Sequence, residues 1–283
     1  MTDIPPLSDE LREEIDRLAD DLDAFRTKRP RAALPAALDR RRHQLLARHT
    51  DSPPQETLTC IGDSNTMFFA GAERLRFIRY RRSGLLKPGW INRGLDLLPC
   101  FRVFHVGPAT AWKAGDHGSS TRSREKLEIL LRKDVARGSK ILISFGEIDC
   151  RIHMARAIQE GKPIEVAVEA TAAKFSELPA WIASLGFQPV IWNIPQIIPK
   201  DEKLSSPTFP FVGPWELRRD ITYAYINALG QHLRKHDIPS VGILGEYHPP
   251  EEKADLAYFH DGVHLSQRLM PLALATLRKA RIL

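Results

Sequence analysis

The chain has 283 residues, of which 43% are hydrophobic and 27% charged, a composition typical of a soluble globular protein with one large core. No apolar run is long enough to cross a bilayer, and residues 1–30 show no signal-peptide pattern. The net charge of +6 is compatible with simple solubility or with an anionic partner, and no motif indicates nucleic-acid binding. Cys60, Cys100 and Cys150 lack paired spacing, which predicts reduced thiols and a cytoplasmic protein.

Two amphipathic helices are expected at the N-terminus. Apolar residues three or four apart over residues 8–28 predict the first helix, and Ser8, which two acidic residues follow, is its expected N-cap. A second helical pattern runs from about residue 35 to 48 and ends at a Ser-, Asp- and Pro-rich linker. Residues 1–55 thus form a predicted helical hairpin. Two uses of its apolar stripe stay open, packing on the rest of the chain or forming a homo-oligomer; the stripe consists of Leu11, Ile15, Leu18, Leu22 and Phe25.

From residue 56 onward, short β-rich runs alternate with amphipathic helical stretches, which predicts crossover units and a parallel sheet covered on both faces. Continuous apolar runs such as "ILISF" are typical of strands buried on both sides. Two helices are expected to end at Gly138 and Gly186, because glycine favours the left-handed conformation found there. The expected strands are 57–61, 101–106, 140–145, 188–193 and 240–244, and the expected helices are 122–137, 165–185 and 215–236.

Polar residues follow most of these strands, and parallel sheets bind ligands beyond the carboxyl ends of their strands. "GDSNT" follows the first strand and "YFHDGVHLS" follows the last. Ser64 lies where a strand is expected to become a helix, which would expose its hydroxyl, while Asp261 and His264 are three residues apart. A serine is a good nucleophile when an imidazole accepts its proton and a carboxylate orients that imidazole. These three residues are therefore candidates for a catalytic triad.

The ordered set of "GDS", a glycine after the second strand, "GEID" after the third and "DGVH" near the C-terminus resembles the SGNH (GDSL-type) hydrolase family over residues 56–283. "GEIDCR" is similar to a branch found around bacterial surface-glycan biosynthesis. The resemblance implies a three-layer, flavodoxin-like α/β/α fold with a five-stranded parallel sheet, and hydrolysis or transfer of an acyl group, expected to be acetyl, on a carbohydrate without a cofactor or metal. It also implies that Ser64 is nucleophile and oxyanion donor, His264 is base and acid, Asp261 orients His264, and Gly107 is a second oxyanion donor.

The third block departs from the family pattern. Ile148 occupies the position at which the family has an asparagine whose amide donates to the oxyanion. The loss of one such donor typically lowers the rate about a hundred- to thousandfold. Either another group substitutes, with Arg151 or a main-chain N–H as the best candidates, or activity is weak, or catalysis has been abandoned. An ion pair between Asp149 and Arg151 that braces the loop is the structural alternative. The residues singled out for substrate contact or support are Asp63, Asn65, Glu147, Asp149 and Arg151.

Two other functions stay open on the sequence alone. If the departure at Ile148 has removed efficient catalysis, the chain is a glycan-binding or scaffolding protein with an SGNH-type fold. A metal-dependent phosphoesterase is the second alternative, because two-metal sites gather Asp and His at strand ends. Its ligands would be Asp63, Asp149, His260, Asp261 and His264.

Aromatic residues and one loop carry further hypotheses about substrate binding. Trp90, Trp112 and Trp215 are candidates for a sugar-stacking platform, with packing as the alternative for each. The segment 209–215, "FPFVGPW", is either a lid that shapes the substrate site or an ordinary connector. His105 is interpreted as a hydrogen-bonded core histidine.

Overall fold

The computed structural model describes residues 4–29, 32–80, 91–194, 209–247 and 255–283. Its centre is a sheet in the order β2-β3-β4-β1-β5-β6-β7, in which five neighbouring strands are parallel. These are the five strands that the sequence predicts, and the three-layer α/β/α fold is thereby confirmed. They are β1 (Leu58–Gly62), β4 (Phe101–His105), β5 (Lys140–Ser144), β6 (Gln188–Trp192) and β7 (Ser240–Val241).

The sheet differs from the prediction at its two edges. β2 (Ile78–Tyr80) and β3 (Ile91–Arg93) add an antiparallel pair beside β4, and their three residues each are too few to show an alternating pattern in the sequence. β7 is shorter than the expected run 240–244, because the chain turns at Gly242 into the short helix α8 (Leu244–Tyr247).

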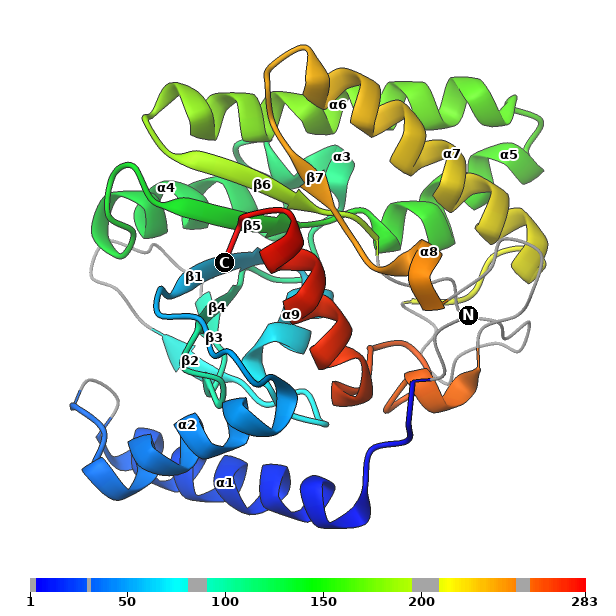
Figure 1. Cartoon of the computed structure of the whole chain (residues 1–283). Coiled ribbons are helices and arrows are strands. Elements are labelled where there is room, and N and C mark those ends of the chain that lie inside the picture. Colours follow the sequence, from blue (N-terminus) through cyan, green and yellow to red (C-terminus); the bar gives the residue numbers. More distant parts are fainter. Residues whose placement is uncertain (1–3, 30–31, 81–90, 195–208, 248–254) are drawn as a thin grey trace.

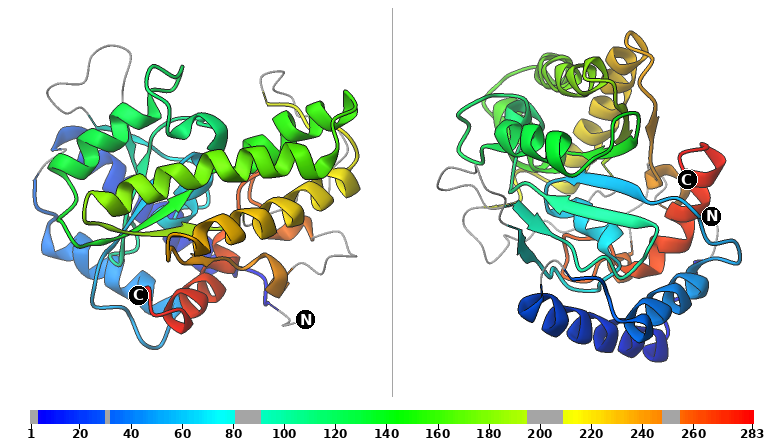
Figure 2. Two further views of the ribbon diagram at one scale, coloured as in Figure 1. Left: turned by 90° about the horizontal axis from the view of Figure 1, so that it is seen from above. Right: turned by 90° about the vertical axis from the view of Figure 1, so that its left-hand side faces the viewer.

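Helices cover both faces of the sheet, and the two hydrophobic cores divide the side chains of each strand between them (Figures 1 and 2). Cys60 and Leu142 point into one core, while their neighbours Ile61 and Ile143 point into the other. Burial on both sides explains why these strands read as continuous apolar runs. One face carries α4 (Ser123–Lys133), α6 (Ile164–Ser184) and α7 (Trp215–Arg234), and the other carries α1 (Asp9–Lys28), α2 (Ala36–His49) and α9 (Met270–Lys279).

The N-terminal hairpin packs on the α/β region and shares its core. Ser8 caps α1 as expected, since its hydroxyl accepts a hydrogen bond from the N–H of Leu11 at 3.2 Å. Ile15, Leu18 and Leu22 on its apolar stripe are buried in the core that also contains Phe69. The stripe is therefore used within the chain, and a homo-oligomer would need another surface.

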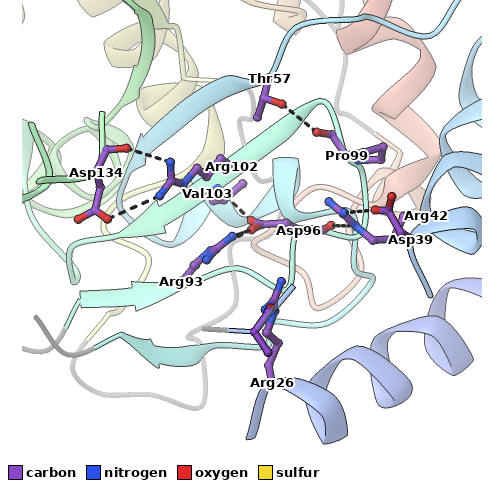
Figure 3. Close-up of polar contacts among 11 residues, drawn as sticks. Arg26, Asp39, Arg42, Thr57, Arg93, Asp96, Pro99, Arg102, Val103 and Asp134 are labelled. Carbon is purple, nitrogen blue, oxygen red and sulfur yellow. Dashed lines mark hydrogen bonds and ion pairs between the residues drawn. The ribbon is translucent and has the colours of Figure 1, made fainter. Parts of the chain in front are cut away.

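A polar network around Asp96 joins the hairpin to the edge of the sheet (Figure 3). The Asp96 carboxylate accepts hydrogen bonds from Arg93 at 2.9 and 2.6 Å and from the N–H of Val103 at 3.1 Å. Arg42 on α2 donates to the backbone oxygen of Asp96 at 2.7 Å and pairs with Asp39 at 2.9 Å. These bonds fix α2 against the turn between β3 and β4, so the hairpin is held by polar contacts as well as by its core.

The C-terminal ends of two helices confirm one prediction and contradict another. Gly186 follows the last residues of α6 with a φ of 85°, as predicted. α4, in contrast, ends at Lys133, and Gly138 lies in the turn that leads to β5.

The three cysteines are free and buried, in agreement with the sequence. Within the described part of the chain, no helix is long and apolar enough to cross a membrane.

Candidate active site

Ser64, His264 and Asp261 form one continuous chain of hydrogen bonds, although 200 residues separate Ser64 from His264. The Ser64 hydroxyl lies 2.8 Å from Nε2 of His264, and Nδ1 of His264 lies 2.7 Å from Oδ2 of Asp261. With Nδ1–H donated to the carboxylate, Nε2 of the neutral imidazole has its lone pair directed at the hydroxyl. The arrangement is able to remove a proton from Ser64.

A short closed loop holds the two C-terminal members of this set. Oδ1 of Asp261 accepts hydrogen bonds from the N–H groups of Val263 and His264 at 2.9 and 2.8 Å. Burial alone would raise the pKa of Asp261, but the bonds from His264 and the two N–H groups outweigh it and hold that pKa well below its usual range. The His260 ring stacks on the His264 ring with centroids 5.7 Å apart. Asp261 is thus a fixed anion beside the imidazole.

An abrupt turn at the end of β1 leaves Ser64 only partly buried. A Cβ on Gly62 would lie 2.0 Å from Oγ1 of Thr66 and 2.1 Å from the backbone oxygen of Ser144, so only glycine lets β1 approach its neighbours this closely. Asp63 then caps the turn by accepting a bond from the N–H of Asn65 at 2.9 Å. The helix expected after Ser64 is a 3-10 helix of seven residues, η1 (Ser64–Ala70). It is too short to be treated as a strong helix dipole.

Two backbone N–H groups are suited to an oxyanion. Within the described residues, the N–H groups of Ser64 and Gly107 donate to no acceptor in the protein. Gly107 directly follows Val106, whose N–H bonds to the backbone oxygen of Gly62 at 3.0 Å, so it lies beside the turn that carries Ser64. The φ of Gly107 is +113°, a conformation that L side chains rarely adopt.

Lys126 is a residue near this site that the sequence interpretation missed. Its Nζ donates to the backbone oxygen of Val106 at 2.6 Å, although Lys126 lies on α4. The signal was present, because position 126 falls on the apolar face of the expected helix 122–137, with Leu127 and Leu130. A lysine on a buried face is unusual and indicates a specific partner.

The third block is built differently from the expectation. Arg151 pairs with Glu147, not with Asp149, through contacts of 2.5 and 3.0 Å. Its guanidinium also donates to the backbone oxygen of Phe209 at 2.8 Å, so it fixes the start of the segment 209–215. The carboxylate of Asp149 instead accepts bonds from the N–H groups that open the short helix α3 (Ala111–Ala114). Glu147 and Arg151 are buried and satisfied by each other, which leaves Arg151 unsuited to replace the missing amide.

Three carboxyl groups lie close together under the site. Burial raises the pKa of Asp63 to about 8, and the neighbouring Glu147 and Asp149 act in the same direction against the hydrogen bonds from Asn65. Burial likewise raises the pKa of Asp149 to about 7, although two N–H groups of α3 favour its anion. Asp63 and Asp149 are each 1% exposed. Their carboxyl groups support the backbone around the site.

A cleft of about 540 Å³ borders the site on the side of Gly107 and Ile148. It contains none of the candidate triad, but its wall begins at Pro108, directly after Gly107. Trp112 lines it and is 41% exposed, whereas Trp215 is buried at the start of α7. Trp90 lies outside the described residues. Hydroxyl groups of the wall come from Thr110, Ser120, Thr121 and Thr171, and its apolar floor includes Ile148, Met154 and Phe209.

The five residues considered as ligands for a metal do not gather at one point. Among the described residues, potential ligand atoms of His260, Asp261 and His264 lie within 4.8 Å of one another. Asp63 and Asp149 lie apart from this group in the buried carboxyl cluster, and their oxygens accept bonds from backbone N–H groups. His264 already bonds to Asp261 through Nδ1 and to Ser64 through Nε2, so the geometry favours an acyl-transfer site over a two-metal site.

No protein-family model matches the sequence, and no curated protein matches it. Solved structures similar to the chain include the OSK domain of Drosophila Oskar, with 14% identity, a TM-score of 0.46, and coverage of 78% of this chain and 88% of that one. Another is Est24, a carbohydrate acetylesterase from Sinorhizobium meliloti (14% identity, TM-score 0.45, 80% and 99% coverage). A third is a catalytic mutant of Axe2, an acetylxylan esterase from Geobacillus stearothermophilus (16%, 0.42, 81% and 96%).

Proposed function

We propose that the chain is a serine esterase or O-acyltransferase that acts on an acylated carbohydrate. We expect the acyl group to be acetyl. The observation that carries the proposal is the unbroken chain of hydrogen bonds from Ser64 through His264 to Asp261. Ser64 is only partly buried, and the N–H groups of Ser64 and Gly107 lie free within the described residues, as an oxyanion site requires. Nucleophile, base and oxyanion donors are then available together.

The reaction proceeds in two halves. Ser64 Oγ attacks the ester carbonyl carbon while Nε2 of His264 takes the hydroxyl proton, and the negative carbonyl oxygen is stabilised by the N–H groups of Ser64 and Gly107. The intermediate collapses when the C–O bond to the sugar breaks, and His264 returns its proton to the leaving oxygen. Water or an acceptor hydroxyl then attacks the acyl-enzyme by the same route in reverse. Asp261 holds the tautomer and stabilises the imidazolium throughout.

The cleft beside Gly107 supports a carbohydrate as the substrate. An exposed indole such as that of Trp112 offers a flat apolar face to a sugar ring, and the threonine and serine hydroxyls around it offer donors and acceptors. Phe209, which Arg151 fixes through its backbone oxygen, closes part of the wall. The segment 209–215 therefore shapes the cleft, and Trp112 is the proposed stacking platform.

The second candidate is a glycan-binding protein without efficient catalysis. One observation favours it: Ile148 is buried and apolar where an amide would complete the oxyanion site. The same cleft would then bind a glycan without turning it over. A cytoplasmic location and an anionic ligand stay predictions from the sequence for either candidate.

An active-site label distinguishes the two candidates. The purified protein is incubated with an alkyl fluorophosphonate and its intact mass is measured, with Ser64→Ala and His264→Ala as controls. One adduct that is absent from both folded variants supports the esterase, and a screen of acetylated glycans follows. If the folded protein gains no adduct while it still binds glycans, the proposed chemistry is wrong and the binding protein is favoured.

A further inference from the structure

Lys126 reaches the candidate oxyanion site from a helix that takes no other part in it. Its side chain is 6% exposed, and Nζ donates to the backbone oxygen of Val106 at 2.6 Å. No carboxylate lies within ion-pairing distance of it among the described residues. Because a buried ammonium without a counter-charge is costly, its place calls for a function.

The bond of Lys126 is made to one particular peptide unit. The carbonyl of Val106 and the N–H of Gly107 belong to the same planar amide, and in the trans form they point in opposite directions. A Cβ on Gly107 would lie 3.5 Å from Nζ of Lys126, which places the ammonium against the carbonyl side of this unit. The N–H side is left for the oxyanion. Withdrawal of electron density at the oxygen makes the N–H a stronger donor, because successive hydrogen bonds polarise one another.

We propose that Lys126 is a positioning residue of the oxyanion site, which strengthens the Gly107 N–H by polarising the Val106–Gly107 peptide and so offsets the absent amide at Ile148. The proposal rests on the proposed esterase function. It also accounts for the missing counter-charge, since the oxyanion itself supplies the negative charge at the other end of the amide.

Arg151, the other basic side chain considered for this task, is excluded by its contacts. Its donors are used by Glu147 and by the backbone oxygens of Phe209 and Pro210. Lys126, in contrast, has one acceptor among the described residues for its three N–H bonds, and that acceptor is the carbonyl of the oxyanion peptide. The two cations are thus used for different purposes, one for the loop and one for the amide.

The test is a pair of lysine variants compared on 4-nitrophenyl acetate. Lys126→Met keeps an unbranched side chain, one atom shorter, but donates nothing. We expect kcat to fall on the order of tenfold with KM little changed, less than for outright loss of an oxyanion donor. Lys140→Met is the matched control, because Lys140 also donates to backbone oxygens, those of Arg281 and Ile282, at the opposite end of β5. It should leave kcat unchanged.

Two further variants separate polarisation from packing. Lys126→Arg keeps a charged donor and should retain most of kcat, and Ile148→Asn should raise kcat by a larger factor in the Lys126→Met background than in the wild type. If Lys126→Met fails to fold, the kcat values of Lys126→Arg and of Ile148→Asn alone still test the inference. A folded Lys126→Met with wild-type kcat, or equal gains from Ile148→Asn in both backgrounds, overturns the inference. Absence of turnover and of a Ser64 adduct in the wild type would refute the proposed function instead.

Discussion

The blocks that carry Ser64 and His264 differ from the block that carries Glu147, Asp149 and Arg151 in what their polar atoms bond to. Ser64 and His264 are bonded to each other across two segments of the chain, at the surface of the sheet's carboxyl edge. Glu147 and Arg151 are bonded within one loop, and Asp149 caps a short helix. The block of Ser64 follows β1 and the block of Glu147 follows β5, and each contains ionisable groups.

The difference shows that a polar motif at a strand end is not by itself a reactive one. A group is available for chemistry when its reactive atom reaches solvent and its partner is another reactive group, as with Ser64 Oγ and His264 Nε2. A group that is buried and fully bonded to backbone supports the structure, as Asp149 does.

The largest effect is expected at the nucleophile and its base. Ser64→Ala and His264→Ala should each lower kcat about a million-fold, and the double variant should be no slower than either, because the two residues act as one unit. The free energy of unfolding should change by less than about 0.5 kcal/mol for Ser64→Ala, since the side chain is small and only partly buried. Steady-state kinetics and denaturant titration measure both. A multiplicative loss in the double variant would show that the residues act separately.

A smaller loss is expected at the carboxylate of the triad. Asp261→Asn keeps the shape but favours the wrong tautomer of His264, so kcat should fall about ten-thousandfold and leave measurable turnover. A fluorophosphonate should still label Ser64, but slowly. If Asp261→Asn were as slow as Ser64→Ala, Asp261 would have a role beyond orienting the imidazole.

The third block should respond in stability. Glu147→Ala leaves the guanidinium of Arg151 buried without its partner, so we expect the free energy of unfolding to fall by about 3–5 kcal/mol. Glu13→Ala, which breaks the exposed pair of Glu13 with Arg17, is the control and should change it by less than about 0.5 kcal/mol. Urea titration measures both. An unchanged stability for Glu147→Ala would contradict a bracing role for the pair.

The last prediction concerns the pH dependence of stability. Because burial raises the pKa of Asp149 to about 7, the folded state holds a proton that the unfolded state loses near pH 4, and this group's contribution to stability is present below pH 4 and is lost as pH rises to about 7. Asp149→Asn removes the titration, so the stability of wild type relative to this variant should decline between pH 4 and 7. Thermal melts across this range measure it. A constant difference would place the Asp149 pKa near its usual value.

The sequence by itself determined the five parallel strands, the helices α1, α2, α4, α6 and α7, and the candidates Ser64, Asp261 and His264. These depend on local patterns, namely runs of apolar residues buried on both faces, a glycine at a tight turn and a three-residue spacing in one loop. Each of these patterns is formed by residues that are close in the sequence, so the sequence alone shows it.

Only the tertiary structure decided what each polar group bonds to. The partner of Arg151 is Glu147 rather than Asp149, and Lys126 meets the Val106 carbonyl from a helix twenty residues away. The edge strands β2 and β3 also depend on pairing with β4 rather than on their own three residues. Hydrogen bonds and burial of this kind are set by segments that come together in space, so no local pattern of the sequence records them.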